Sequence, residues 1–318
     1  MKIRKGTDMQ HALITGASGA IGIALIRDLI AHGVKVTALL RPGSERNAAV
    51  SALQGVTVME CGLSELGEER IREKLQSAGP FDVFYHLAWA GTSGAARNDM
   101  DLQSANIAYT LDAVRLAHDL SCRRFIGVGS QAEYGRTQET LGEETPCRPE
   151  NGYGIAKLGA GWMSRILCDQ LGLEHVWTRV LSVYGPGDGK QSLISVLTDT
   201  LLSGESPRCT KGEQIWDYIF SGDAAEFLRR LADADADGRT FCIGSGRTQT
   251  LRAYMEQVRD AVSEFTGKAA PEIIYDRPYP EGQVMHLQTD ITELSGLTGY
   301  MPETEFKDGI LQILREKR

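Results

Sequence analysis

The stretch Thr15-Gly16-Ala17-Ser18-Gly19-Ala20-Ile21-Gly22 follows a short apolar run and precedes a segment whose apolar residues recur at helical spacing until Gly33. This order predicts a strand, a tight turn and a helix. Glycines let the backbone approach a pyrophosphate closely, and the helix N-terminus offers free N–H groups with a partial positive charge. A flexible turn with chance glycines is the alternative. The flanking pattern favours dinucleotide binding through Gly16, Ser18, Gly19, Ala20, Ile21 and Gly22.

Apolar runs and helical patterns alternate beyond this turn. Further strands are expected at residues 34–40, 56–59, 82–88, 124–129 and 175–180, and helices at 66–78, 102–120 and 153–171. Strands that alternate with helices indicate βαβ units, hence a parallel sheet with helices on both faces. The predicted fold class is α/β, a Rossmann-like doubly wound parallel sheet with a smaller, mostly C-terminal α/β substrate-binding lobe.

The alternation becomes less regular after residue 183, and this change predicts the domain organisation. Helical segments at 193–202, 223–232 and 251–265 are interleaved with short strands at 218–220 and 241–243, and a helix-like segment closes the chain. We expect residues 1–186 to form the dinucleotide-binding domain, to which the chain returns at about 216–247. Residues 187–215 and 248–318 would form the substrate lobe.

The end of the second predicted strand bears on the choice of cofactor. A carboxylate there accepts hydrogen bonds from the adenosine ribose of NAD, whereas a cation meets the 2′-phosphate of NADP. The chain reads Leu39-Leu40-Arg41-Pro42-Gly43-Ser44-Glu45-Arg46, with no acidic residue at the strand end. Arg41 can hold a phosphate with its guanidinium, and Ser44 and Arg46 could add donors. NADP(H) is therefore favoured, and NAD(H) is the alternative if Arg41 is only a solvated side chain.

Tyr153 and Lys157 are spaced i and i+4 on a predicted helix and so share one face. A nearby ammonium lowers the pKa of a phenol, so Tyr153 could exchange a proton with a substrate oxygen while hydride moves to or from carbon. Such a pair is also common on ordinary helix surfaces. Its meaning depends on the segment Gly129 to Gly135, which contains Ser130 and follows the fifth predicted strand.

Taken together, these motifs resemble those of the extended short-chain dehydrogenase/reductase family, in its group of nucleotide-sugar 4-keto-reductases, epimerases and dehydratases. The resemblance spans nearly the whole chain and rests on the glycine turn, Asp82 with His86-Leu87-Ala88, Asn106, Ser130 with Tyr134-Gly135, Tyr153 with Lys157, Arg179 with Tyr184-Gly185-Pro186-Gly187, and Asp217-Tyr218. It implies that Tyr153 is the general acid/base. It also implies that Lys157 lowers the pKa of Tyr153 and binds the nicotinamide ribose, and that Ser130 binds the reacting sugar oxygen.

The same resemblance implies further binding residues. Leu87 and Ala88 would line the cofactor, Trp89 would lie by the substrate, and Arg277 would grip the diphosphate of a nucleotide-sugar substrate. Three positions depart from the family pattern. Cys61 lies in a stretch without the aspartate that commonly contacts adenine, Trp216 stands where many relatives carry an arginine, and Ser182 stands where many carry an asparagine. A homodimer through the helices at 102–120 and 153–171 is also implied.

The residues around Ser130 separate the reactions of this group. Dehydratases commonly carry an extra acid and base where this chain has Gln131 and Ala132, neither of which shuttles protons. The arrangement Ser130-x-x-Glu133-Tyr134-Gly135 looks like that of some 4-keto-6-deoxyhexose reductases. We expect a reductase that uses NADPH, with a 4-epimerase holding NAD as the alternative. A 4,6-dehydratase and a non-catalytic NADP sensor are less favoured.

Composition limits the other classes of function. The 318 residues carry a net charge of −8, with 42% hydrophobic and 24% charged residues, which is typical of a packed globular protein and argues against nucleic-acid or anionic-membrane partners. Six dispersed cysteines predict unpaired thiols, and no metal site is readable. The first residues lead into no secretory apolar region, and no stretch is long enough to span a bilayer. A cytoplasmic protein is expected.

Overall fold

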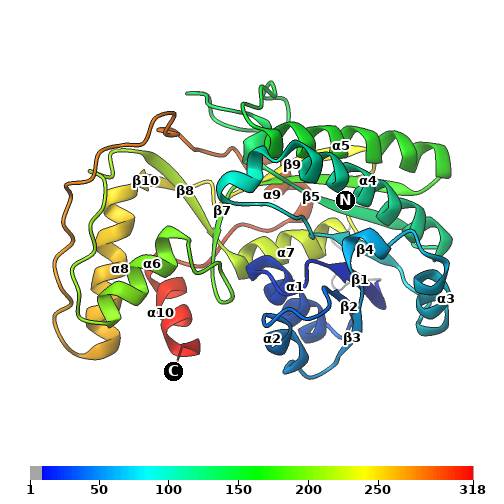
Figure 1. The fold of residues 1–318 in the computed structure, drawn as a ribbon, viewed down its shortest axis with the longest axis horizontal. Helices are drawn as coiled ribbons and strands as arrows, with labels where there is room; N and C mark the ends of the chain where they lie inside the picture. The colour runs from blue at the N-terminus through cyan, green and yellow to red at the C-terminus, as the bar shows by residue number, and fades with distance from the viewer. Residues whose placement is uncertain (1–8, 318) are drawn as a thin grey trace.

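The computed structural model describes residues 9–317. The expectation that the protein carries no secretory segment rests on residues 1–8, which lie outside this range. A seven-stranded parallel sheet has the order β3-β2-β1-β4-β5-β6-β9 (Figure 1). Its strands are β1 His11–Thr15, β2 Lys35–Leu40, β3 Val56–Glu60, β4 Val83–His86, β5 Arg124–Ser130, β6 Glu174–Val180 and β9 Arg239–Ile243. Thr15 at the end of β1 lies opposite both Leu39 and His86. The strand order reverses here, and a crevice forms at the carboxyl ends of such strands.

Successive residues of β1 face two different helical layers. Ala12 and Ile14 pack in a core with α1 (Ala20–Ala31) and α7 (Ser221–Leu231), whereas Leu13 packs in a second core on the other face of the sheet. That second core contains residues of α3 (Glu69–Ala78), α4 (Met100–Asp119) and α5 (Gly152–Leu171). Because a strand buried on both faces needs apolar residues at consecutive positions, the runs read from the sequence are continuous rather than alternating.

A smaller three-stranded sheet has the order β10-β8-β7. Its strands are β7 Ser182–Tyr184, β8 Ile215–Phe220 and β10 Thr248–Thr250; β8 runs parallel to β7 and antiparallel to β10. A separate apolar core joins this sheet to α6 (Leu193–Leu202), α8 (Leu251–Thr266) and α10 (Phe306–Glu316). Although β8 belongs to the small sheet, α7 and β9 after it pack in the large one. The division of the chain into a dinucleotide-binding domain and a substrate lobe stays a prediction.

The strands and helices predicted from periodicity are present, with ends that differ by a few residues, and the Rossmann-like α/β fold class is confirmed. Shorter elements were not predicted from the sequence. They span fewer than two helical turns or two strand alternations, which is too little for a hydrophobic period to show. These are β7, β10, α2 (Asn47–Ser51), α9 (Thr292–Thr298) and the 3₁₀ turns η1 (Leu63–Glu65), η2 (Gly94–Asn98) and η3 (Gln131–Glu133).

All six cysteines are unpaired, as expected, and five of them are buried. Burial raises the pKa of the Cys61 thiol to about 12, which keeps this thiol protonated and unreactive. Within residues 9–317, no helix is both long and apolar enough to cross a membrane.

Candidate functional site

The glycine turn is packed so closely that only glycine fits at two of its positions. Gly16 has φ +72°, and a Cβ there would lie 2.6 Å from the backbone of Leu87 and Ala88. A Cβ on Gly22 would lie 2.5 Å from the carbonyl oxygen of Gly16. Gly19 is the N-cap of α1 and supplies no capping side chain, so the N–H groups of the first helical turn are left for other acceptors. This cradle fits a dinucleotide pyrophosphate.

Two neighbouring cavities of about 600 and 890 Å³ share Gly16, Gly19, Arg46, Leu87 and Thr92 in their walls. The smaller cavity reaches from the glycine turn to the ends of β2 and β3, and the larger one reaches from α1 to Val128, Val183 and residues 187–192. Several predicted cofactor residues line one or both of them, namely Gly16, Ser18, Gly19, Ala20, Ile21, Gly22, Arg41, Leu87 and Ala88. The structure thus brings these residues to one place.

Three side chains at the end of β2 border the smaller cavity: Arg41, Ser44 and Arg46. Arg41 is exposed, and its backbone carbonyl accepts a hydrogen bond from Asn47 Nδ2 at 2.8 Å. Arg46 donates from Nη2 to the carbonyl oxygen of Gly187 at 2.6 Å. Arg46 therefore contacts the loop that lines the larger cavity, which sequence reasoning did not anticipate.

Ser130 and Tyr153 are brought together by the end of β5 and the start of α5. The Asn151 side chain caps α5 by accepting from Gly154 N at 2.9 Å, and Ser130 Oγ accepts from Ala132 N at 3.2 Å. Tyr153 is only 8% exposed. This burial raises the pKa of Tyr153, whereas a hydrogen bond with Ser130 and the charge of Arg97 lower it. The structure thus places Ser130 beside Tyr153, and their catalytic roles stay predictions.

Lys157 is fully enclosed one turn further along α5. Its Nζ donates to the carbonyl oxygen of Val128 at 2.5 Å and lies 3.9 Å from the centre of the Trp89 ring. Burial lowers the pKa of Lys157 to about 7. The cation in contact with the Tyr153 ring is instead Arg97, whose guanidinium carbon lies 4.4 Å from the ring centre. Arg97 lies in η2, where no periodic pattern or motif in the sequence marks it.

Glu133 is fully buried and committed to internal contacts. Its carboxylate accepts from Ser130 N at 2.8 Å, from Arg179 Nε at 2.9 Å and from Trp177 Nε1 at 3.2 Å. Burial raises the pKa of Glu133, and the guanidinium of Arg179 lowers it. Because every contact points into the protein, Glu133 holds Ser130 in place and has no path to a substrate proton.

The loop after β4 is fixed by side chains from α4. Asn106 Oδ1 accepts from Ala90 N at 3.0 Å, and its Nδ2 donates to the Ala90 carbonyl at 2.9 Å. The Trp89 indole donates to Gln103 Oε1 at 2.9 Å, and its ring meets Tyr153 edge-on with 6.2 Å between centroids. Trp89 also lines the smaller cavity. Trp89 therefore lies beside Tyr153, and its role toward a substrate stays a prediction.

Of the predicted substrate residues, Trp89 lines the smaller cavity, whereas Ser130, Ser182, Trp216 and Arg277 line neither of the two cavities. Ser182 on β7 accepts a hydrogen bond from the Trp216 indole on β8 at 2.8 Å, so the two departures from the family pattern are partners. Arg277 is exposed in the loop before α9, where its backbone N–H donates to the Cys209 carbonyl at 3.0 Å. The roles of Ser182, Trp216 and Arg277 toward a substrate stay predictions.

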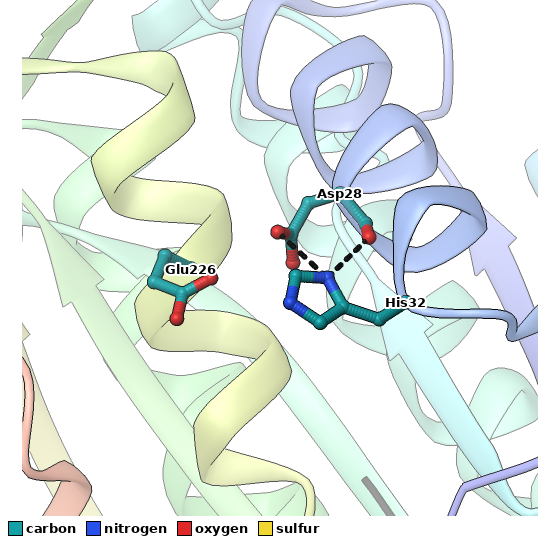
Figure 2. A group of neighbouring side chains, drawn as sticks. All are labelled: Asp28, His32 and Glu226. Atoms are coloured by element: carbon teal, nitrogen blue, oxygen red, sulfur yellow. Dashed lines mark hydrogen bonds and ion pairs between the residues drawn. The ribbon is translucent and has the colours of Figure 1, made fainter. Parts of the chain in front are cut away.

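One cluster away from these cavities has metal-ligand chemistry: Asp28, His32 and Glu226 (Figure 2). His32 Nδ1 lies 2.8 Å from the Asp28 carbonyl oxygen. Arg229 neutralises both acids, since its Nε lies 2.7 Å from Asp28 and its Nη2 lies 2.5 Å from Glu226. These contacts make the cluster an ion-pair network that joins α1 to α7.

The fold and the site together define a Rossmann-like protein of the extended short-chain dehydrogenase/reductase class. The features that define it are the parallel sheet, the glycine cradle where the strand order reverses, and the adjoining Ser130, Tyr153 and Lys157. Residues 12–244 match the NAD dependent epimerase/dehydratase family, and the chain belongs to that family. This result confirms the family that the motifs indicated.

Relatives with several activities are similar to the chain over most of its length. A dTDP-glucose 4,6-dehydratase of Xanthomonas campestris pv. campestris is 24% identical over 94% of this chain and 91% of its own. A dTDP-4-dehydro-6-deoxyglucose reductase of Escherichia coli is 22% identical over 96% of this chain and 97% of its own. The solved UDP-glucose 4-epimerase of Thermotoga maritima superposes with a TM-score of 0.83 and 22% identity, covering 97% of this chain and 99% of that one. These family members act on nucleotide sugars.

Proposed function

We propose that the protein reduces a nucleotide-linked 4-keto-6-deoxyhexose with NADPH. The observation that carries this proposal is Arg41, a cation in the wall of the smaller cavity at the end of β2, beside Ser44. Among residues 9–317, no carboxylate lines that wall to bind an unphosphorylated ribose. A reductase must exchange spent cofactor for NADPH in every turnover. A residue that binds the 2′-phosphate, such as Arg41, selects NADPH, the cofactor that is kept reduced for such reactions.

The chain's own residues supply the proton and the alignment for this reaction. The nicotinamide, when bound, supplies hydride to the carbonyl carbon. Tyr153 donates its phenolic proton to the carbonyl oxygen, so that the ketone becomes an alcohol and the phenolate is reprotonated from solvent. Ser130 donates a hydrogen bond to the same oxygen and stabilises the charge that develops on it. Lys157 would hold the ribose, and the carbonyl of Val128 sets the position of its ammonium.

Two other reactions of the family fit the site less well. Dehydration needs an additional acid and base, but Gln131 and Ala132 titrate no proton and Glu133 is held by Ser130, Trp177 and Arg179. A 4-epimerase would use Tyr153 in the same way while keeping NAD bound throughout. We rank it second because Arg41 favours a phosphorylated cofactor.

Mixing the purified protein with NADPH and dTDP-, UDP- or CDP-4-keto-6-deoxyhexoses tests the proposal. A reductase consumes one NADPH per alcohol formed, Tyr153→Phe abolishes turnover, and cofactor affinity stays close to that of the parent. Interconversion of C4 epimers without net NADPH oxidation would identify an epimerase. Binding of NADPH without reaction on any nucleotide sugar would support the non-catalytic sensor and contradict the proposal.

We also propose that the protein is a homodimer through α4 and α5, which lie side by side on one face of the large sheet (Figure 1). Four large apolar side chains of α5 are exposed at helical spacing, namely Ile155 (57%), Trp162 (66%), Met163 (46%) and Ile166 (56%). An apolar stripe of this kind on an outer helix marks an interaction surface. A second copy would cover it with the same stripe about a two-fold axis.

A further inference from the structure

The Tyr153 ring lies between two other side chains, and neither of them is Lys157. The Arg97 guanidinium lies over the ring at 4.4 Å, and Trp89 meets the ring edge-on. Lys157 Nζ lies over the Trp89 indole ring, 3.9 Å from its centre, and donates a hydrogen bond to the Val128 carbonyl. The cation that faces the phenol thus comes from η2, a separate segment of the chain.

Several contacts fix η2 against the start of α5. Gly152 N donates to Asn98 Oδ1 at 3.0 Å, and a Cβ on Gly152 would lie 3.0 Å from the Arg97 carbonyl oxygen. The Arg97 guanidinium also donates from Nη1 to the Thr92 carbonyl at 3.2 Å. Thr92 itself lines both cavities. Arg97 is therefore anchored at the edge of the candidate active site by backbone packing.

In the described part of the chain, no ion pair neutralises the charge of Arg97. Among residues 9–317, no aspartate or glutamate lies within ion-pair distance of its guanidinium, in contrast to Arg179, Arg229 and Arg136, which all have carboxylate partners. A guanidinium without a carboxylate keeps its full attraction for an aromatic face and for a nearby anion.

We propose that Arg97 is a positioning residue for Tyr153: its guanidinium orients the phenol ring and stabilises the phenolate left when the proton has moved to the substrate. This inference rests on the proposed reduction, in which Tyr153 is the acid. It assigns to Arg97 an electrostatic role that the sequence pattern assigned to Lys157.

The other polar and charged groups around Tyr153 also influence its pKa, so they bear on what removing Arg97 should do. Ser130 donates a hydrogen bond that favours the phenolate, while the carboxylate of Glu133, itself bonded to Arg179, opposes it. Lys157 is on the same helix, but Trp89 and the Val128 carbonyl occupy its ammonium. Arg97 is thus the cation whose removal should raise the pKa of Tyr153.

A titration without substrate or cofactor tests this role directly. The ionisation of Tyr153 is isolated as the near-ultraviolet difference between each protein and the same protein carrying Tyr153→Phe. Arg97→Met should move the Tyr153 ionisation upward by about one pH unit, the size expected for loss of a partly buried cation–π contact. Arg97→Lys should restore part of the shift because it keeps the charge. Arg115→Met removes an exposed arginine of α4 and should change nothing.

The kinetic counterpart uses NADPH oxidation across the pH range. Reduction requires protonated Tyr153, so the alkaline fall in kcat should move to higher pH in Arg97→Met while the plateau drops by roughly tenfold. An unshifted Tyr153 titration in a folded Arg97→Met protein would overturn the inference. A rise in KM for the nucleotide sugar with an unchanged pH profile would also overturn it, because Arg97 would then bind the substrate rather than act on Tyr153. If Arg97→Met fails to fold, Arg97→Gln serves the same test. Because the titration needs no turnover, a wrong choice of reaction would leave its result intact.

Discussion

Arg46 Nη2 donates a hydrogen bond to the carbonyl oxygen of Gly187 at 2.6 Å, and this contact links the two cavities. Arg46 follows the strand end that the cofactor is expected to meet, whereas Gly187 begins the loop of residues 187–192, which lines the larger cavity. One side chain thus touches the predicted cofactor site and the neighbouring loop.

Arg46→Met should weaken both NADPH and the nucleotide sugar. A hydrogen bond to a charged group contributes about 1.5–3 kcal/mol, so each KM should rise roughly tenfold or more. Steady-state kinetics with each substrate varied in turn measure this effect, and Glu45→Gln at the exposed neighbouring position is the control. A change confined to NADPH would show that Arg46 is only a phosphate ligand.

Arg41→Asp should weaken NADPH more than NADH because a carboxylate would repel the 2′-phosphate that the guanidinium attracts. A charged hydrogen bond contributes about 1.5–3 kcal/mol, so selectivity should fall by roughly tenfold or more. The ratio of kcat/KM for the two cofactors is the measurement. Equal losses for both cofactors would remove the basis for assigning NADPH.

Lys157 should make stability depend on pH. Burial lowers its pKa from 10.5 to about 7, so between these values the unfolded chain holds a proton that the folded protein does not. The free energy of unfolding contributed by this group should therefore rise with pH across that window. Lys157→Met should flatten the rise when urea unfolding is compared at about pH 7 and about pH 9. The exposed Lys74→Met is the control, and an equal slope in both variants would contradict the prediction.

Glu133→Gln should destabilise the protein by about 3–5 kcal/mol because it leaves Arg179 buried beside an uncharged partner. The matched control is Glu150→Gln, which breaks the exposed pair with Arg136 and should cost about 0–1 kcal/mol. Denaturant unfolding followed by circular dichroism compares the two. Similar losses would mean that the Glu133 carboxylate contributes little beyond its volume.

Trp162→Glu should dissociate the proposed homodimer because a charge would be buried at the centre of the apolar stripe on α5. Sedimentation velocity at micromolar concentration distinguishes the monomer from the dimer. Val196→Glu, which alters another exposed apolar side chain on α6, should leave the assembly unchanged. A parent protein that sediments as a monomer would refute the proposal.

The sequence alone determined the features that depend only on residues close together along the chain. The glycine turn could be read because a positive φ at Gly16 and the close backbone approach at Gly16 and Gly22 demand glycine. The sheet could be read because each strand and helix imposes its own period. The spacing of Tyr153 and Lys157 likewise fixes one helix face. These signals arise within a few residues, so they survive without knowledge of the packing.

Only the tertiary structure decided which distant side chains meet. Arg97 lies over Tyr153 because η2 is hydrogen-bonded to the start of α5, and Ser182 meets Trp216 because β7 and β8 pair in register. The ring of Trp89 and the Val128 carbonyl likewise hold the ammonium of Lys157. Such contacts depend on how whole elements pack, and the free energy that selects them is spread over the three apolar cores. No local pattern in the chain records them.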